Sequence, residues 1–236
     1  MSRTEQIASG LTAVRERIAA ACAAAGREPG DVHLVVVTKT YPSSDVAILA
    51  ELGVSDVGEN RHPEAERKRA ELGADGGGLT WHFVGGLQTN KADAVARYAD
   101  VVHSVDRLRL VRALGKGAAK ADRVIDALVQ VNLEGRDEAS GGRAGADPAE
   151  VEQIAAAIEG EPGLRLRGTM AVAPLGEDAA KAFERLRECA AALAEVHPQA
   201  TIVSAGMSGD LEAAIAAGAT HVRIGRAVLG ERPPLR

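Results

Sequence analysis

Short apolar segments alternate with amphipathic segments along almost the whole 236-residue chain. The apolar segments are only a few residues long and rich in Val and Ile, which is typical of buried β-strands. The amphipathic segments place apolar residues three or four positions apart, which is typical of helices packed on a sheet. The expected strands cover 33–37, a short segment ending at 56–58, 80–84, 101–103, 124–132, 164–172, 201–204 and 221–224. The expected helices cover about 4–25, 43–52, 63–72, 89–98, 106–120, 147–159, 177–196 and 210–217.

Small polar residues mark several helix starts. Ser43 or Ser44 is the predicted cap of the second helix, and Asp106 and Asp147 are expected to open two later ones, because their side chains can accept hydrogen bonds from free backbone N–H groups. Gly26 is expected to end the first helix. After the last strand we expect only a short terminal segment.

Eight strand–helix units in about 230 residues predict a closed (β/α)8 TIM barrel of the α/β class, with an extra N-terminal helix. No interval is long enough for a second domain, so we expect residues 1–236 to form a single domain. A doubly wound open sheet is the alternative. Its dinucleotide fingerprint is missing, since no Gly-x-Gly-x-x-Gly follows the first strand.

The bulk chemistry excludes several kinds of partner. The formal net charge is -5, so the chain lacks the basic surface expected of proteins that bind nucleic acid or anionic membranes. Aromatic residues make up only 2% of the chain, which argues against stacking platforms for bases. The two cysteines, Cys22 and Cys189, form no disulfide framework, and no segment has the apolar length of a membrane span. A cytoplasmic location is the simplest expectation.

In a barrel of this kind the functional face lies at the carboxyl ends of the strands. Lys39 follows the first strand there, on the same face as Val35 and Val37. Partial desolvation lowers the pKa of a lysine and frees its amine as a nucleophile for Schiff-base formation. The alternative is a lysine whose ammonium group reaches the solvent at the barrel rim.

A second feature is the glycine- and serine-rich segment from Ser204 to Asp210, which joins a strand to a helix. Small residues allow several backbone N–H groups to approach one anion, and barrels often bind phosphate after strands seven and eight. Gly225 and Arg226 lie in the second of these loops. A plain glycine-rich turn is the alternative, but together with Lys39 the pattern favours a phosphorylated carbonyl ligand.

The histidines do not predict a metal site. The six histidines are scattered, and no pair has the spacing of metal ligands on a helix. His82 and His103 fall at the ends of neighbouring strands, yet a metal needs several convergent ligands. We expect no metal, and we interpret His82 as a hydrogen-bonded strand residue.

Taken together, the motifs resemble those of the pyridoxal phosphate homeostasis proteins, relatives of the N-terminal barrel of alanine racemase. The resemblance covers essentially the whole chain, in order and at matching spacing. It is carried by Thr38-Lys39, Gly58-Glu59-Asn60, Trp81-His82-Phe83-Val84-Gly85, Leu87-Gln88-Thr89-Asn90-Lys91, Gly168-Thr169-Met170-Ala171, Ser204-Ala205-Gly206-Met207-Ser208 and Arg223-Ile224-Gly225.

The resemblance implies a binding site for pyridoxal 5′-phosphate (PLP). Lys39 would carry PLP as an internal aldimine, Asn60 would lie beside the ring, and Arg223 would face the pyridine nitrogen. Because arginine stays protonated, it favours an unprotonated pyridine, which is a poor electron sink and suits a carrier better than a transaminase. The implied phosphate contacts are Ser204, the backbone of Gly206 and Met207, Gly225 and residue 226.

The chain departs from the family pattern at several positions. Arg226 stands where the family usually has Thr, Gly86 where Pro is usual, and Thr89 where Ser is usual. An arginine at 226 either adds a charge-assisted phosphate contact or points outward and removes a hydroxyl contact. The loop 135–146 departs most, and we assign it no role.

The resemblance implies a protein that holds PLP and supplies it to apo-enzymes, with no catalytic residues of its own and at most residual racemase activity. An amino-acid racemase is the first alternative. Racemisation needs a second acid/base group, which alanine racemase takes from a further domain; here only Tyr41 is placed to replace it. A Schiff-base or metal-assisted barrel lyase is another alternative. We expect a monomer.

Overall fold

Eight parallel strands close into a barrel in chain order, and β1 pairs with both β2 and β8. This computed structural model describes residues 1–73, 75–134 and 145–231. The closed sheet confirms the predicted (β/α)8 barrel, and the open-sheet alternative is wrong. The strands are β1 (His33–Val37), β2 (Asp56–Glu59), β3 (Thr80–Phe83), β4 (Val101–Val105), β5 (Ile125–Gln130), β6 (Leu164–Met170), β7 (Ile202–Ser204) and β8 (His221–Ile224).

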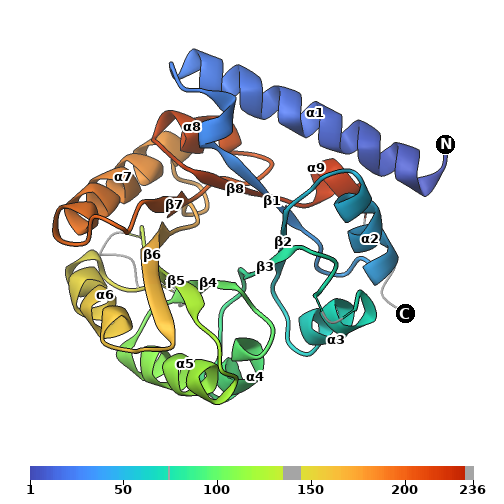
Figure 1. The fold of residues 1–236 in the computed structure, drawn as a ribbon. Coiled ribbons are helices and arrows are strands. Elements are labelled where there is room, and N and C mark those ends of the chain that lie inside the picture. The colour runs from blue at the N-terminus through green and yellow to red at the C-terminus, as the bar shows by residue number, and fades with distance from the viewer. Residues whose placement is uncertain (74, 135–144, 232–236) are drawn as a thin grey trace.

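Helices surround the barrel as an outer ring, and α1 lies across the outside of α8 and α9 (Figure 1). The α-helices are α1 (Arg3–Ala24), α2 (Ser43–Glu51), α3 (Glu64–Glu71), α4 (Ala92–Ala96), α5 (Leu108–Lys120), α6 (Val151–Glu159), α7 (Ala179–Val196), α8 (Leu211–Ala216) and α9 (Arg226–Leu229). Single 3-10 turns, Pro29–Asp31, Thr89–Lys91 and Pro148–Glu150, precede β1, α4 and α6.

The extra helix α1 forms as its sequence pattern predicts. Ser2 and Glu5 make a reciprocal capping box at its first turn, which satisfies two backbone N–H groups. Its apolar residues are buried against the side of the barrel where β1 meets β8, together with residues of α8 and α9. The buried residues of α1 are Ile7, Leu11, Val14, Ile18, Ala21 and Cys22.

The structure corrects two predicted caps. Pro42 precedes α2 without a side-chain cap, and the Ser43 hydroxyl instead donates to Glu71 Oε2 at 2.6 Å, which ties α2 to α3. Asp106 pairs with Arg107, and α5 begins two residues later than predicted. Asp147 does cap its turn, since its Oδ1 accepts from Ala149 N at 2.9 Å.

Further expectations concern the C-terminal segment, the loop at 135–146 and the number of domains. The terminal segment contains a helix, α9, which the sequence pattern did not indicate. Most of the loop at 135–146 falls outside the described residues, and the single-domain assignment of 1–236 stays a prediction. Across the described ranges, no helix is both long and apolar enough to cross a bilayer.

Candidate functional site

A cavity of about 430 Å³ opens at the carboxyl ends of the strands. Its position agrees with the face where barrels of this class carry their function. Its volume lies in the range of small-molecule sites, about 300–1,000 Å³. The cavity is lined by Val37, Lys39, Tyr41, Asn60, Val84, Val172, Met207, Ser208, Gly209, Arg223, Gly225 and Arg226.

The structure brings six of the eight predicted cofactor residues to this cavity: Lys39, Asn60, Met207, Arg223, Gly225 and Arg226. Two lie behind the wall. Ser204 is fully buried and Gly206 is buried too, and neither lines the cavity. In place of Ser204, the neighbouring Ser208 and Gly209 face the cavity. The sequence could have indicated that Ser208 and not Ser204 faces the cavity, because Ser204 ends a strand and Ser208 lies in the loop beyond it.

Lys39 is half-buried and lies two residues beyond the end of β1, so the strand brings its side chain to the cavity. The chain turns sharply there, with Tyr41 N donating to Thr38 O at 3.0 Å. Thr40, at the third position of this turn, has φ +71°. A β-branched residue is strained in this left-handed region, and such strain is found mostly at functional sites.

A buried ion-pair cluster holds both neighbours of Lys39. The Lys68 ammonium donates to Thr38 O at 2.8 Å and contacts Glu59 Oε1 at 2.7 Å and Glu64 Oε1 at 2.8 Å. Glu64 Oε1 also accepts from Thr40 N at 2.7 Å, so the same cluster fixes the strained turn from the other side. Sequence reasoning missed Lys68. This residue lies on α3, nine residues after Glu59, and its sequence context is typical of a solvent-exposed charge.

The two carboxyl groups of this cluster differ in acidity. Burial raises the pKa of Glu59 in spite of the neighbouring Lys68 ammonium. Burial also acts to raise the pKa of Glu64, but the hydrogen bonds from Lys68 and from Thr40 N outweigh it and hold the pKa below its usual range. Glu64 therefore stays ionised and anchors the turn after Lys39.

Asn60 owes its position to a glycine that lies just beyond the end of the next strand, β3. A Cβ at Gly85 would lie 2.3 Å from Asn60 O and 2.8 Å from Asn60 Cβ, so only glycine allows this close approach. The Asn60 side chain lines the cavity, and its buried Oδ1 atom has no hydrogen-bond partner among the described residues. A buried acceptor in this state favours a ligand that donates to it.

Arg223 brings a positive charge to the cavity floor. Its guanidinium is buried and donates to Ser204 Oγ at 2.7 Å and to Ala171 O at 2.9 Å. Burial lowers the pKa of Arg223 to about 10, which still leaves it protonated at neutral pH. In the part of the chain that the structure describes, no carboxylate is in ion-pair contact with it. An electron-rich ligand atom would complete its surroundings.

The family described as "Alanine racemase, N-terminal domain" matches residues 10–233. Pyridoxal phosphate homeostasis proteins of Mycobacterium tuberculosis and Escherichia coli are 41% and 40% identical to the chain. The alignments cover 98% and 96% of this chain and 94% and 97% of those proteins. A solved structure of PipY from Synechococcus elongatus, with PLP bound, is 34% identical, with a TM-score of 0.80 over 95% of this chain and 100% of that chain.

Proposed function

The chain belongs to the alanine racemase N-terminal domain family and to the pyridoxal phosphate homeostasis proteins, and on this basis we propose that it binds and stores PLP in the 430 Å³ cavity. The observation that carries the proposal is that a lysine amine and a buried guanidinium line the same cavity. PipY, which shares the fold and a third of the sequence, has PLP bound.

The residues of the cavity fit PLP in three ways. The Lys39 amine suits the aldehyde, the Arg223 guanidinium suits the lone pair of the pyridine nitrogen, and the unpartnered Asn60 Oδ1 suits a donor on the ring. The loops after β7 and β8 offer Ser208, Gly209, Gly225 and the Arg226 side chain to a phosphate. When bound, PLP supplies an aldehyde that an unprotonated lysine amine can attack, with loss of water.

Arg223 sets the chemistry that the protein favours. It is a permanent donor, so it holds the pyridine nitrogen as an acceptor and disfavours protonation there. A neutral ring withdraws little electron density from a neighbouring carbanion. Fast reactions of amino acids at PLP need this withdrawal to stabilise the carbanion. The arrangement therefore supports a carrier role.

An amino-acid racemase is supported less well. Racemisation needs an acid/base group on the face opposite the lysine. Tyr41 lines the cavity, but its hydroxyl donates to Gly230 O at 2.6 Å. Tyr98 is buried and does not line the cavity. We expect at most residual turnover of alanine, and robust racemisation by the purified protein would contradict the carrier role.

Release of PLP to apo-enzymes is the next part of the proposal. The cavity opens at the rim beside Val172, which is 40% exposed, and Met207, which is 41% exposed. An apo-enzyme mixed with the loaded protein should recover activity as the visible absorption of the loaded protein falls. No recovery would contradict the supply role and leave PLP binding standing.

Location and assembly complete the proposal. Cys22 and Cys189 are both free thiols, which supports a reducing compartment, the cytoplasm. We also propose a monomer, which light scattering on the purified protein would test. A stable dimer at micromolar concentration would contradict that part.

An absorption titration with PLP tests the binding proposal. The wild-type protein should develop a visible band with added PLP, and Lys39→Ala should not. Lys116→Ala removes an exposed lysine on α5 and should behave as wild type. A wild-type protein that gains no band would contradict the proposed function.

A further inference from the structure

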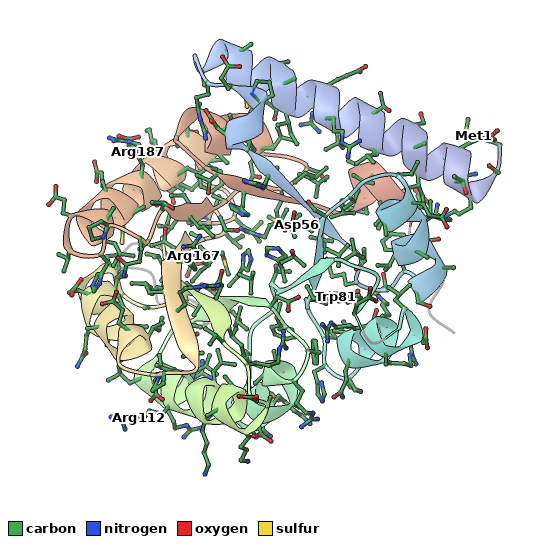
Figure 2. All side chains as sticks on the ribbon, in the orientation of Figure 1. Met1, Asp56, Trp81, Arg112, Arg167 and Arg187 are labelled. Atoms are coloured by element: carbon green, nitrogen blue, oxygen red, sulfur yellow. The ribbon has the colours of Figure 1, made fainter. Side chains whose placement is uncertain are left out.

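A row of polar side chains crosses the barrel interior, where apolar layers are usual. His82 Nε2 lies 2.9 Å from Asp56 Oδ1, and His82 Nδ1 lies 2.8 Å from His103 Nε2. His103 Nδ1 lies 3.0 Å from Ser204 Oγ, which accepts from Arg223 Nη1 at 2.7 Å. Figure 2 shows Asp56 on the inner side of the barrel ring. The five residues come from β2, β3, β4, β7 and β8.

Only one assignment of hydrogens satisfies this row while both histidines are neutral and Asp56 is ionised. The Asp56 carboxylate can only accept, which fixes the hydrogens of both histidines and leaves His103 Nδ1 as an acceptor, so Ser204 Oγ donates its hydrogen to His103 Nδ1 and accepts from Arg223. His103 then donates from Nε2 to His82 Nδ1, and His82 donates from Nε2 to the Asp56 carboxylate. Every bond therefore points in one direction, from Arg223 to Asp56.

Burial keeps this direction fixed. His103 is fully buried, and burial together with the neighbouring His82 lowers its pKa well below the usual value. At the far end, burial acts to raise the pKa of Asp56, but the hydrogen bonds from His82 and Ser55 hold it below its usual range. A neutral His103 and an ionised Asp56 are the states that the one-way row requires.

The groups that surround the row do not reverse it. His221 stacks on His33 with ring centroids 4.8 Å apart and lies 6.3 Å from His82. Burial and its histidine neighbours lower the pKa of His221 to about 3, so it stays neutral. Two further charges act on His221: Asp56 favours its protonated form, and Arg167, on β6, favours its neutral form.

We propose that this row is a relay that orients Arg223 toward the pyridine nitrogen of PLP, with His82 and His103 as positioning residues. The inference rests on the proposed function and deepens it. The Asp56 charge polarises each bond in turn, which makes Ser204 Oγ a stronger acceptor for the Arg223 N–H group. Through the relay, the Asp56 carboxylate at the opposite end of the barrel thus keeps the Arg223 guanidinium in one orientation.

The relay also gives Ser204 a role different from phosphate binding. The Ser204 hydroxyl hydrogen is directed to His103, and the residue does not line the cavity. Asp56 begins β2 and Asn60 follows its end, so the carboxylate acts from about 13 Å below the cavity, at about 3.3 Å per residue. An effect of Asp56 on the ring nitrogen would therefore travel through the row.

Two measurements on PLP-loaded protein test the relay: the PLP dissociation constant, and the ¹⁵N NMR shift of PLP labelled at the ring nitrogen. Ser204→Ala and His103→Phe should weaken PLP binding about tenfold, the scale of one lost bond to a charged group. Both should move the ¹⁵N shift away from the wild-type value. Ser204→Thr keeps the hydroxyl and should restore both readouts.

Asp56→Asn keeps the size of the side chain and removes its charge at a partly exposed position, so it tests the relay even if His103→Phe fails to fold. We expect a ¹⁵N shift in the same direction as in His103→Phe, but smaller. His197→Phe is the matched control, because His197 is a buried histidine bonded to Glu152 and Glu159 outside the barrel. It should leave both readouts unchanged.

The outcomes separate the two proposals. Failure of the wild-type protein to bind PLP would contradict the proposed function itself. Normal PLP binding by the wild type, with wild-type ¹⁵N shifts in folded His103→Phe and Asp56→Asn, would overturn the relay alone.

Discussion

At the scale of single residues, the site depends on side chains that never touch the cavity. Lys68 holds the backbone on one side of Lys39, and Glu64 holds it on the other. Removing one member of such a buried cluster leaves a charge without its partner, a loss of about 3–5 kcal/mol. Two side chains of the helix α3 therefore hold the backbone on both sides of Lys39.

Thr40→Gly should separate stability from binding. Glycine adopts φ +71° without strain, which should stabilise the folded state by about 1–3 kcal/mol. Glycine also makes the unfolded chain more flexible, which should destabilise the folded state by about 0.5–1 kcal/mol. We expect a higher melting temperature and several-fold weaker PLP binding, because the turn that aims Lys39 becomes looser. A lower melting temperature would show that Thr40 is not strained.

Arg226→Thr tests the departure from the family pattern. Arg226 is exposed and lines the cavity, so salt would screen the proposed contact of its side chain with a phosphate. We expect several-fold weaker PLP binding at low ionic strength and a smaller difference in molar salt. Equal affinities at low salt would mean that only the backbone of residue 226 matters.

At the scale of elements, the site loops are braced from outside the barrel. α9 begins directly after Gly225 and carries Arg226, and α1 packs along its outer side (Figure 1). Gly10 makes this contact close, since a Cβ there would lie 2.4 Å from Val228 O and 2.9 Å from Ala227 O. The N-terminal helix α1 thus supports the segment that brings Gly225 and Arg226 to the cavity.

Gly10→Ala should lower the free energy of unfolding by about 1–3 kcal/mol, because the added methyl group would overpack the contact between α1 and α9. We expect this loss although alanine favours the helix over glycine by about 1 kcal/mol. The displaced α9 should also weaken PLP binding. Ser9→Ala, at an exposed position of the same helix, is the control and should be neutral or slightly stabilising. Urea unfolding of the three proteins makes the comparison, and a stabilised Gly10→Ala would contradict the close contact.

The elements also show what the sequence pattern can and cannot predict. The bounds of β1 and β8 agree with the prediction, which rested on their β-branched residues. The cap at Ser43 was wrong because a tertiary partner, Glu71, takes its hydroxyl. The helix α9 was missed because four residues are too short for a periodic signal.

At the scale of the whole molecule, the barrel interior contains hydrogen-bonded polar side chains behind the cavity. Six of the predicted cofactor residues line the cavity because they lie at or just beyond the carboxyl ends of strands, a position that follows from the fold alone. The depth of Ser204 and its link to His103 did not follow, because they depend on which side chains of strands distant in sequence meet inside the barrel. Local patterns hold no information on such pairings.

Histidines whose pKa is lowered in the folded barrel make its stability depend on pH. His221 is neutral when folded, with a pKa of about 3, whereas the unfolded chain binds a proton near pH 6.5. The unfolded state therefore binds more protons below pH 6.5, so stability falls as the pH drops from 6.5 toward 3. Each such histidine contributes up to about 1.4 kcal/mol per pH unit.

Urea unfolding between pH 6.5 and pH 5, above the range where most carboxyl groups titrate, measures this slope. His221→Phe keeps a ring against His33 and should flatten the slope by the contribution of one histidine. An unchanged slope in His221→Phe would show that His221 is protonated in the folded barrel.

We propose that the Lys39 amine holds PLP in the barrel cavity. Borohydride reduction of the PLP-loaded protein, followed by peptide mass spectrometry, tests it most directly. We predict that a phosphopyridoxyl group is found on the peptide containing Lys39 at one equivalent per chain. Modification spread over exposed lysines, with Lys39 unmodified, would contradict the account.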